Sequence, residues 1–409
     1  MRGAQAAVPP MTMEWAPVLA CDADCPLCPF RRSRLKLEQG TVTPGKIASS
    51  DDKHAASLET AHRVLEAAYE GGVRGVLFTG GGEPLVWEHL LDALKYSSDL
   101  SMDNCMYTNG FRLGDEGSLA HSLLSPQNHL VFVRVSVNAM SRGVVRKHWG
   151  LDVIEVDRQI EGLAALLHAR NNLVGEYETA GRSVPSIQIS TIIDRQNIED
   201  LPAICDTVAR VFRAVRVVRG VEDVMVVRPL TIHGRPNGYS THDHDDSVVR
   251  GIVSECGAGG RGANVLAAAG LAVYLGFGLS EVEGGQVPTY SALVEREYAS
   301  RDVSWSNGLF LTVGPDGTVY PTTERNCDAK WGMGSLLDQS VRDIYSGDRR
   351  QSILARLNSE HWGPSVAQPT SRTARLDRIA RALMSGELGS AEIAEVQQRA
   401  LRQHQVILD

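Results

Sequence analysis

Three cysteines lie within eight residues near the start of the chain: Cys21, Cys25 and Cys28. The chain has seven cysteines in all, an odd number, and so tight a group does not fit a disulfide framework. Three thiolates on one short loop can bind three irons of a 4Fe–4S cluster and leave the fourth iron open. Zinc is the alternative, but a structural zinc site needs a fourth ligand, and no CxxC or HxxxH partner supplies it. The spacing therefore favours an iron–sulfur cluster.

A second motif follows about 50 residues later, where an apolar run at residues 73–78 leads into Thr-Gly-Gly-Gly-Glu-Pro at residues 79–84. Consecutive glycines allow a ligand to approach the backbone closely. Glu83 lies at the carboxyl end of the predicted strand, where it can accept hydrogen bonds from an amine. Taken alone, the motif also fits a tight turn between a strand and a helix, with an acid that caps the helix.

Together, and in this order, the two motifs resemble those of the radical S-adenosylmethionine (SAM) superfamily, over residues 15–230. The resemblance implies cluster ligands at Cys21, Cys25 and Cys28, and contacts to the amino group of SAM at Gly81, Gly82 and Glu83. In that family the open iron chelates the amino and carboxylate groups of SAM. Leu27 would lie near the adenine, although that position is often aromatic in the family.

Four polar residues within or at the ends of predicted strands are weaker matches to the family. Ser136, Asn138 and Ser190 correspond to ribose or carboxylate contacts, and Arg228 could pair with the carboxylate of SAM or with the substrate. Each of them is equally well explained as an ordinary polar residue at the end of a strand. The Thr-Asn-Gly sequence at residues 108–110 also ends a strand, where a simple turn is the plain interpretation.

The resemblance implies that one electron enters the cluster, that SAM is cleaved, and that a 5′-deoxyadenosyl radical takes a hydrogen atom from the substrate. The protein's share is then orientation and the exclusion of water. A flavodoxin or ferredoxin is the expected electron donor. The basic stretch at residues 31–36 could bind such an acidic partner, although it also fits a solvated face.

Apolar runs that alternate with amphipathic stretches predict parallel βα units in the first 230 residues. Strands are predicted at residues 17–20, 73–78, 104–107, 130–137, 186–193 and 223–227, and helices at residues 58–69, 87–96, 156–169 and 198–212. Six such strands predict an α/β fold, a partial (βα)6 TIM-like barrel, because a closed barrel needs eight. The apolar run at residues 265–279 is too short for a membrane span, and it predicts a helix that turns at Gly270 into a buried strand.

A loop at residues 235–247 is the expected domain boundary, which gives a barrel domain at 1–234 and a small α+β cap at 235–409. In the cap, Gly-Pro-Asp-Gly at residues 314–317 predicts a hairpin between strands 309–313 and 318–320, and helices are expected at residues 373–384 and 390–405. The hairpin and residues 331–336 resemble the SPASM or twitch extension of radical SAM enzymes. That extension carries auxiliary clusters, but here its cysteine is replaced by Thr322 and only Cys327 lies nearby. We therefore expect a single cluster.

Without an auxiliary cluster to accept an electron, redox-neutral outcomes are expected: epimerisation, rearrangement, elimination or decarboxylation. A thiol can return a hydrogen atom to a substrate radical, and Cys327 and Cys256 are candidates for this role. The competing interpretation of both is a small buried hydrophobic residue.

The composition fits a globular protein, with 43% hydrophobic and 22% charged residues among 409. A net charge of −8 argues against nucleic-acid binding, and the absence of a secretory signal favours the cytoplasm without membrane attachment. The expected substrate is a small natural-product intermediate, such as an amino sugar, nucleoside or amino acid, because the short N-terminus leaves no room for a leader-peptide domain. Modification of a ribosomally made peptide is the second hypothesis, and a non-catalytic iron–sulfur or zinc protein is the third.

Overall fold

The computed structural model describes residues 10–25, 28, 30, 54–115, 117–149, 153–215, 217–229, 246–276, 310–323 and 326–361. Several sequence predictions fall outside these residues: Leu27, the basic stretch at 31–36, the domain boundary at 234, and both helices beyond residue 372. Among the described residues, no helix has the length and apolar character needed to cross a membrane.

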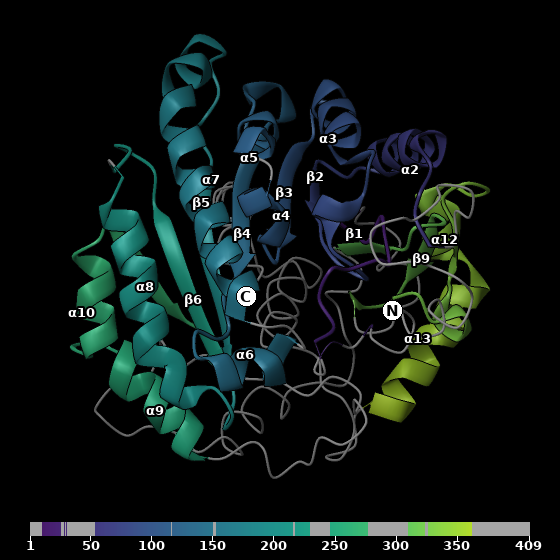
Figure 1. Cartoon of the computed structure of the whole chain (residues 1–409). Helices are drawn as coiled ribbons and strands as arrows, with labels where there is room; N and C mark the ends of the chain where they lie inside the picture. Colours follow the sequence, from purple (N-terminus) through teal and green to yellow (C-terminus); the bar gives the residue numbers. More distant parts are fainter. Residues whose placement is uncertain are drawn as a thin grey trace, which may run out of the picture.

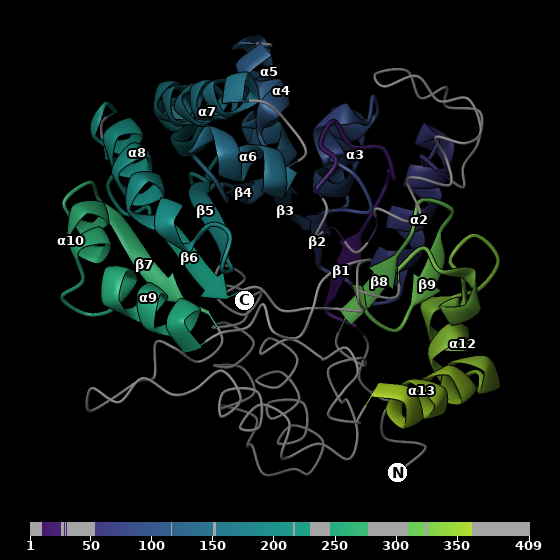
Figure 2. The same cartoon turned by 60° about the horizontal axis from the view of Figure 1, so that its bottom comes forward.

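One ten-stranded sheet organises the chain, in the order β10-β9-β8-β1-β2-β3-β4-β5-β6-β7. From β8 to β7 all neighbouring strands are parallel, and β9 and β10 add an antiparallel edge. The strands are β1 (Thr12–Trp15), β2 (Gly75–Phe78), β3 (Asp103–Thr108), β4 (Leu130–Ser136), β5 (Ser186–Ile193), β6 (Asp223–Pro229), β7 (Leu271–Leu275), β8 (Phe310–Val313), β9 (Thr318–Tyr320) and β10 (Gly334–Ser335). This is the predicted α/β architecture, an open, barrel-like sheet (Figures 1 and 2).

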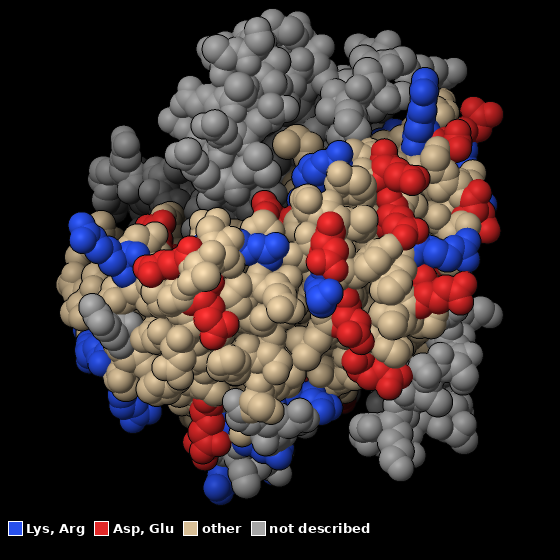
Figure 3. All heavy atoms as spheres, turned by 90° about the horizontal axis from the view of Figure 1, so that it is seen from above, with Lys and Arg blue, Asp and Glu red and all other residues tan. Residues whose placement is uncertain are grey.

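Helices cover the convex face of the curved sheet, as both views show. They are α2 (Leu58–Glu70), α3 (Leu90–Asp99), α4 (Phe111–Asp115), α5 (Gly117–Leu123), α6 (Arg142–Trp149), α7 (Val153–Thr179), α8 (Leu201–Arg213), α9 (Asp246–Cys256), α10 (Arg261–Ala267), α12 (Val341–Ser346) and α13 (Asp348–His361). The Ser57 side chain accepts a hydrogen bond from the Thr60 amide and so fixes the start of α2, as an N-cap does. Seen from above, acidic and basic side chains are interspersed over the described surface (Figure 3).

The first strand lies earlier in the sequence than predicted. β1 is Thr12–Trp15, whereas residues 17–20 were predicted to be the strand. The strand was missed because the charged residue Glu14 interrupts its apolar pattern. Glu14 points to the inner face of the sheet, where its carboxylate accepts a hydrogen bond from the Thr323 hydroxyl at 2.7 Å. The apolar stretch after β1 instead pairs with the segment before α2, through an isolated bridge between Val18 and Ala55.

Strands from beyond residue 235 complete both sides of the sheet. The predicted hairpin is confirmed as β8 and β9, and its first strand β8 pairs in parallel with β1, with Thr12 opposite Phe310. On the other side, the chain turns at Gly270, whose φ is 87°, and enters β7, which pairs in parallel with β6. A positive φ is accessible to glycine at little steric cost. The sheet therefore contains strands from both predicted domains, the barrel domain at 1–234 and the cap at 235–409.

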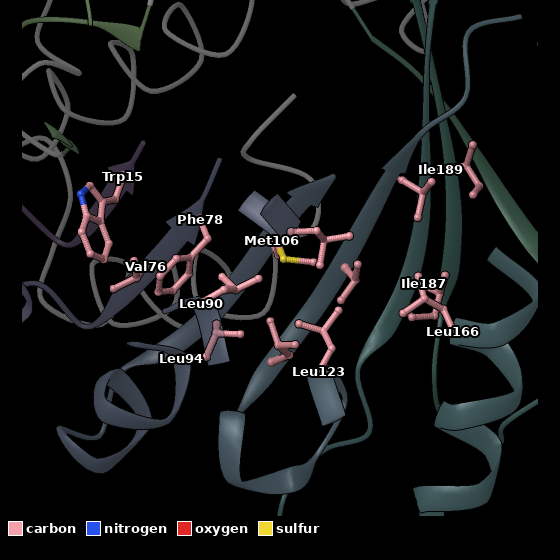
Figure 4. Packing of buried hydrophobic residues seen from close by; sticks show 14 of the residues in the cluster. Trp15, Val76, Phe78, Leu90, Leu94, Met106, Leu123, Leu166, Ile187 and Ile189 are labelled. Atoms are coloured by element: carbon pink, nitrogen blue, oxygen red, sulfur yellow. The ribbon is translucent and has the colours of Figure 1, made fainter. Parts of the chain in front are cut away.

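The main core lies between the sheet and the helices, and Figure 4 shows part of it. Strand residues such as Phe78, Met106 and Ile189 meet helix residues such as Leu94 and Leu166 there. A smaller cluster occupies the opposite, concave face, where Leu77, Cys105 and Phe132 pack together. Because side chains alternate along a strand, each strand contributes to both layers.

Candidate cluster and cofactor site

The two sequence motifs meet at the carboxyl ends of β1 and β2. The Glu83 amide donates a hydrogen bond to the carbonyl of Ala20, at 2.7 Å, directly before the cysteine loop. A Cβ atom on Gly82 would lie 1.8 Å from that same carbonyl oxygen, and a Cβ on Gly81 would lie 2.1 Å from a methyl group of Leu19. The glycines are therefore required because the cysteine-bearing segment packs directly on the backbone of the second motif.

The Glu83 side chain joins the ends of β2 and β3. Its carboxylate accepts hydrogen bonds from the Leu85 amide at 3.0 Å, the Thr108 hydroxyl at 2.6 Å and the Asn109 amide at 2.7 Å. Burial, and then the nearby charge of Asp22, raise the pKa of this carboxyl to about 8. The sequence assigned Glu83 to the amino group of SAM; in the structure its oxygens are engaged with the protein itself.

The three thiols of the cysteine loop form no disulfide bond and are partly exposed. The Ala23 amide points to the Cys21 sulfur at 3.4 Å, and the Cys28 amide donates to the Cys25 carbonyl at 3.1 Å. These contacts fold the loop back on itself.

One side of the loop is apolar. Cys21 and Cys25 pack against a small buried cluster made of Ala23, Phe111, Ala139, Val145 and Val156. In the described part of the chain, no three His, Cys, Asp or Glu side chains are gathered around one point as ligands of a single metal ion would be. The thiolates of a 4Fe–4S cluster each bind a different iron, so the donor set of partly exposed, unbridged thiols fits such a cluster.

The weaker candidates lie on the next strands of the same edge. Ser136 of β4 is opposite Ser190 of β5, and Arg228 of β6 is opposite Ile192. Asn138 follows β4, and its side-chain oxygen accepts a hydrogen bond from the Ile192 amide at 2.9 Å. The Nε atom of Arg228 is buried without a hydrogen-bond partner among the described residues. Ligands of open parallel sheets bind at the carboxyl ends of the strands, so this wall is suited to cofactor or substrate.

The two candidate hydrogen donors lie in different layers. Cys256 ends α9 inside the outer helical layer, and its sulfur is 3.7 Å from that of Cys205 in α8. Cys327 follows β9, beside Asn326, whose amide donates to the carbonyl of Val313 at the end of β8, at 3.3 Å. The structure thus brings Cys327, and not Cys256, to the edge that carries the cysteine loop.

Cys327 also differs from an ordinary surface thiol. Burial, and then the charge of Asp316, raise its pKa to about 12, so the thiol keeps its proton at neutral pH. Its backbone has a φ of 62°, which is uncommon for a residue with a side chain. The thiol points to the side-chain oxygen of Asn326 at 3.2 Å.

A polar group on the concave face was missed in the sequence analysis. The Arg134 guanidinium donates two hydrogen bonds to the side-chain oxygen of Gln188, at 2.9 and 2.6 Å, and one to the Tyr107 hydroxyl at 3.1 Å. It also lies over the Tyr107 ring, 4.9 Å from the centroid. The only signal in the sequence is that these polar residues alternate with apolar ones in their strands.

Comparison with known proteins agrees with this geometry. The sequence model of the Radical SAM superfamily matches residues 16–208. No protein with a curated description matches the sequence.

Similar solved structures include SuiB from Streptococcus suis. The structure bound to S-adenosylmethionine has a TM-score of 0.54 and 14% identity, with 87% of this chain and 69% of SuiB covered. SuiB bound to its precursor peptide SuiA has the same TM-score and identity, with coverages of 85% and 67%. The enzyme anSMEcpe with bound AdoMet has a TM-score of 0.50 and 10% identity, with coverages of 92% and 98%. This likeness shows the fold.

The family match covers the cysteine loop, the glycine motif and the four parallel strands β2 to β5, whose carboxyl ends lie at one edge of the sheet. The cofactors of the family are SAM and an iron–sulfur cluster. Residues 16–208 therefore match the Radical SAM superfamily, and this match together with the fold supports a radical SAM enzyme.

Proposed function

We propose that this enzyme abstracts a hydrogen atom from a small natural-product intermediate, such as an amino sugar, nucleoside or amino acid, and completes a redox-neutral reaction. When bound, SAM and the cluster would supply the carbon-centred radical that takes the hydrogen atom. The observation that carries the proposal is the position of Cys327 beside the end of β8, with a thiol that keeps its proton. Epimerisation uses this thiol most directly.

In an epimerisation, the thiol of Cys327 returns a hydrogen atom to the substrate radical on the opposite face. The C–H bond that forms takes the hydrogen and one electron from sulfur, which leaves a thiyl radical on Cys327. One electron and one proton then restore the thiol, and a flavodoxin or ferredoxin is the proposed source of that electron. A thiolate has no hydrogen atom to give, so the high pKa of Cys327 suits this step.

The remaining residues of the edge have binding roles in this proposal. Cys21, Cys25 and Cys28 would hold a single cluster, and the backbone of Gly81 and Gly82 would contact the amino group of SAM. Ser136, Asn138, Ser190 and Arg228 would contact the ribose, the SAM carboxylate or the substrate. The buried Nε of Arg228 supports this assignment, since an unpaired buried donor costs free energy until a ligand accepts from it.

Modification of a ribosomally made peptide is the second candidate. The observation in its favour is the likeness to SuiB bound to its precursor peptide. An anaerobic assay separates the two candidates: the enzyme, SAM and a reductant are incubated with panels of amino sugars, nucleosides, amino acids and short peptides. Small molecules are expected to stimulate 5′-deoxyadenosine formation; stimulation by peptides alone would favour the second candidate.

The role of Cys327 is tested in D2O with the small molecule that stimulates the reaction. The wild-type product is expected to carry one deuterium from the exchanged thiol. Cys327→Ala is expected to keep 5′-deoxyadenosine formation and to lose the deuterated product, whereas the matched variant Cys205→Ala keeps both. Deuterium that persists in Cys327→Ala, or a product oxidised by two electrons, would contradict the redox-neutral proposal.

A further inference from the structure

Asn109 is fixed firmly at the end of β3. Only 6% of the residue is exposed. Its amide nitrogen donates to the Glu83 carboxylate at 2.7 Å, and its side-chain oxygen accepts from the Phe111 amide at 3.1 Å. The Gln159 side chain of α7 donates to its backbone carbonyl. These bonds fix both the backbone and the orientation of the side-chain amide.

From this position the amide group of Asn109 reaches the cysteine loop. Its Nδ2 donates to the Asp22 carboxylate at 2.6 Å, and the same nitrogen lies 4.0 Å from the sulfur of Cys21. An amide nitrogen carries two hydrogens, so both contacts can exist together. The contacts cross 87 and 88 residues of sequence and join β3 directly to the cluster-binding loop.

We propose that Asn109 is a positioning residue for the cluster: it holds Cys21 and Asp22 against the end of β3, and its N–H donor at the Cys21 sulfur raises the reduction potential of the cluster. Hydrogen bonds to cluster sulfurs are one of the means by which proteins set these potentials, because they stabilise the more electron-rich, reduced state. The contact to Asp22 acts in the same direction, since it binds a carboxylate that would otherwise disfavour adding an electron. The inference rests on the radical SAM assignment and not on the substrate.

The first test uses the cluster-free protein, so it does not depend on the enzyme's reaction. Alkylation of each cysteine by a maleimide is followed anaerobically by mass spectrometry, with Cys327 as the internal reference. Asn109→Ala is expected to increase the labelling rate of Cys21 several-fold and to leave that of Cys327 unchanged. Equal Cys21 rates in the wild type and the variant would overturn the positioning role.

The matched control is Asn128→Ala, which removes a second buried asparagine from the opposite edge of the sheet. Asn128 is 5% exposed, and its amide donates two hydrogen bonds, to the carbonyls of Ser122 and Leu123 at 2.9 Å. Both variants lose buried hydrogen bonds, but only Asn109→Ala loses a contact to the cysteine loop. If Asn128→Ala raised Cys21 labelling equally, the effect would reflect general loosening and the proposal would fail.

The second test measures the midpoint potential of the reconstituted cluster by a redox titration monitored by electron paramagnetic resonance. Asn109→Ser keeps a side-chain acceptor for the Phe111 amide but cannot reach Asp22 or Cys21. We expect its potential, and that of Asn109→Ala, to shift to more negative values, while Asn128→Ala keeps the wild-type potential. An unchanged potential in both Asn109 variants, or a shift to more positive values, would overturn the role in setting the potential.

Discussion

The buried carboxyl groups at the two edges of the parallel sheet have different hydrogen-bond partners. At the amino-terminal edge, Asp223 receives both bonds of Arg170, at 2.6 and 2.7 Å, and the Ile187 amide donates to it as well. At the carboxyl-terminal edge, Glu83 receives hydrogen bonds only from neutral donors among the described residues, and a second acid, Asp22, adds its charge.

This difference suggests that Asp223 contributes to the stability of the fold and that Glu83 contributes to the functional site. Burial raises the pKa of Asp223, and Arg170 opposes that shift, so the pair is balanced by a charge of opposite sign within the protein. The described hydrogen bonds to Glu83 come from neutral donors alone, and because its pKa is raised to about 8, a nearby cationic ligand such as SAM would favour the ionised form of this carboxyl. The buried acid Asp223 is thus paired with a cation within the fold, whereas the raised pKa of Glu83 is typical of a functional site.

Breaking the Arg170–Asp223 ion pair, at the amino-terminal edge of the sheet, is expected to have the largest effect on stability. Asp223→Asn leaves the Arg170 guanidinium, which is 1% exposed, without its charge partner. Urea unfolding of the cluster-free protein is expected to show a loss of about 3–5 kcal/mol. The double variant Arg170→Met/Asp223→Leu should recover most of this loss, because it removes both charges. A single variant as stable as the wild type would show that the pair is dispensable.

Replacing Glu83, at the carboxyl-terminal edge of the sheet, should alter the pH dependence of stability. The pKa of Glu83 is about 8 in the folded protein, above its ordinary value of 4.5, so the unfolded chain releases this proton first as pH rises. Glu83 therefore lowers stability between pH 4.5 and 8, by at most about 1.4 kcal/mol per pH unit. The stability difference between Glu83→Gln and the wild type should change across this window in favour of the glutamine variant. A difference that is constant with pH would contradict the assignment.

A methyl group at the junction of the two motifs should impair cluster binding. Gly82→Ala places a Cβ 1.8 Å from the Ala20 carbonyl, so the cysteine-bearing segment must move, at a cost of about 1–3 kcal/mol. Gly175→Ala in α7 is the control, since nothing lies within 4 Å of its added Cβ, and alanine favours a helix by about 1 kcal/mol. Iron bound per chain after reconstitution should fall in Gly82→Ala only. Full iron binding in that variant would show that the junction tolerates displacement.

The smallest effect is expected for the outer helical layer. Cys256→Ala removes one sulfur from the buried pair with Cys205 and should cost about 1–2 kcal/mol of stability. It should leave the deuterium incorporation of the D2O assay unchanged, unlike Cys327→Ala. Loss of deuterium in Cys256→Ala would contradict this expectation and would indicate that Cys256 is the hydrogen donor.

The sequence predicted the parallel strands and the two motifs well, because both leave local signals: apolar runs of strand length, clustered cysteines and consecutive glycines. It predicted β5 with its exact bounds, Ser186–Ile193. It missed β1, because the buried acid Glu14 interrupts the apolar pattern and its partner Thr323 lies 309 residues away.

The hydrogen bonds of the site were not predictable either, because they join residues that are far apart in the sequence. Thr108 and Asn109 have the composition of a turn, and nothing local indicates that they bind Glu83 and Asp22. Pairing of β8 with β1, and the separation of Cys256 from Cys327, likewise depend on contacts between distant segments. Such contacts follow from the assembled sheet and not from spacing.

The central claim, that the cysteine loop and the glycine motif form one radical SAM site, is tested most directly by a single anaerobic experiment. The protein is reconstituted with iron and sulfide, reduced with dithionite and given SAM, and both iron per chain and 5′-deoxyadenosine are measured. We predict about four irons per chain and 5′-deoxyadenosine formation, with both lost in Cys25→Ala. A full cluster that yields no 5′-deoxyadenosine with any substrate panel, or 5′-deoxyadenosine formation that persists in Cys25→Ala, would contradict the account.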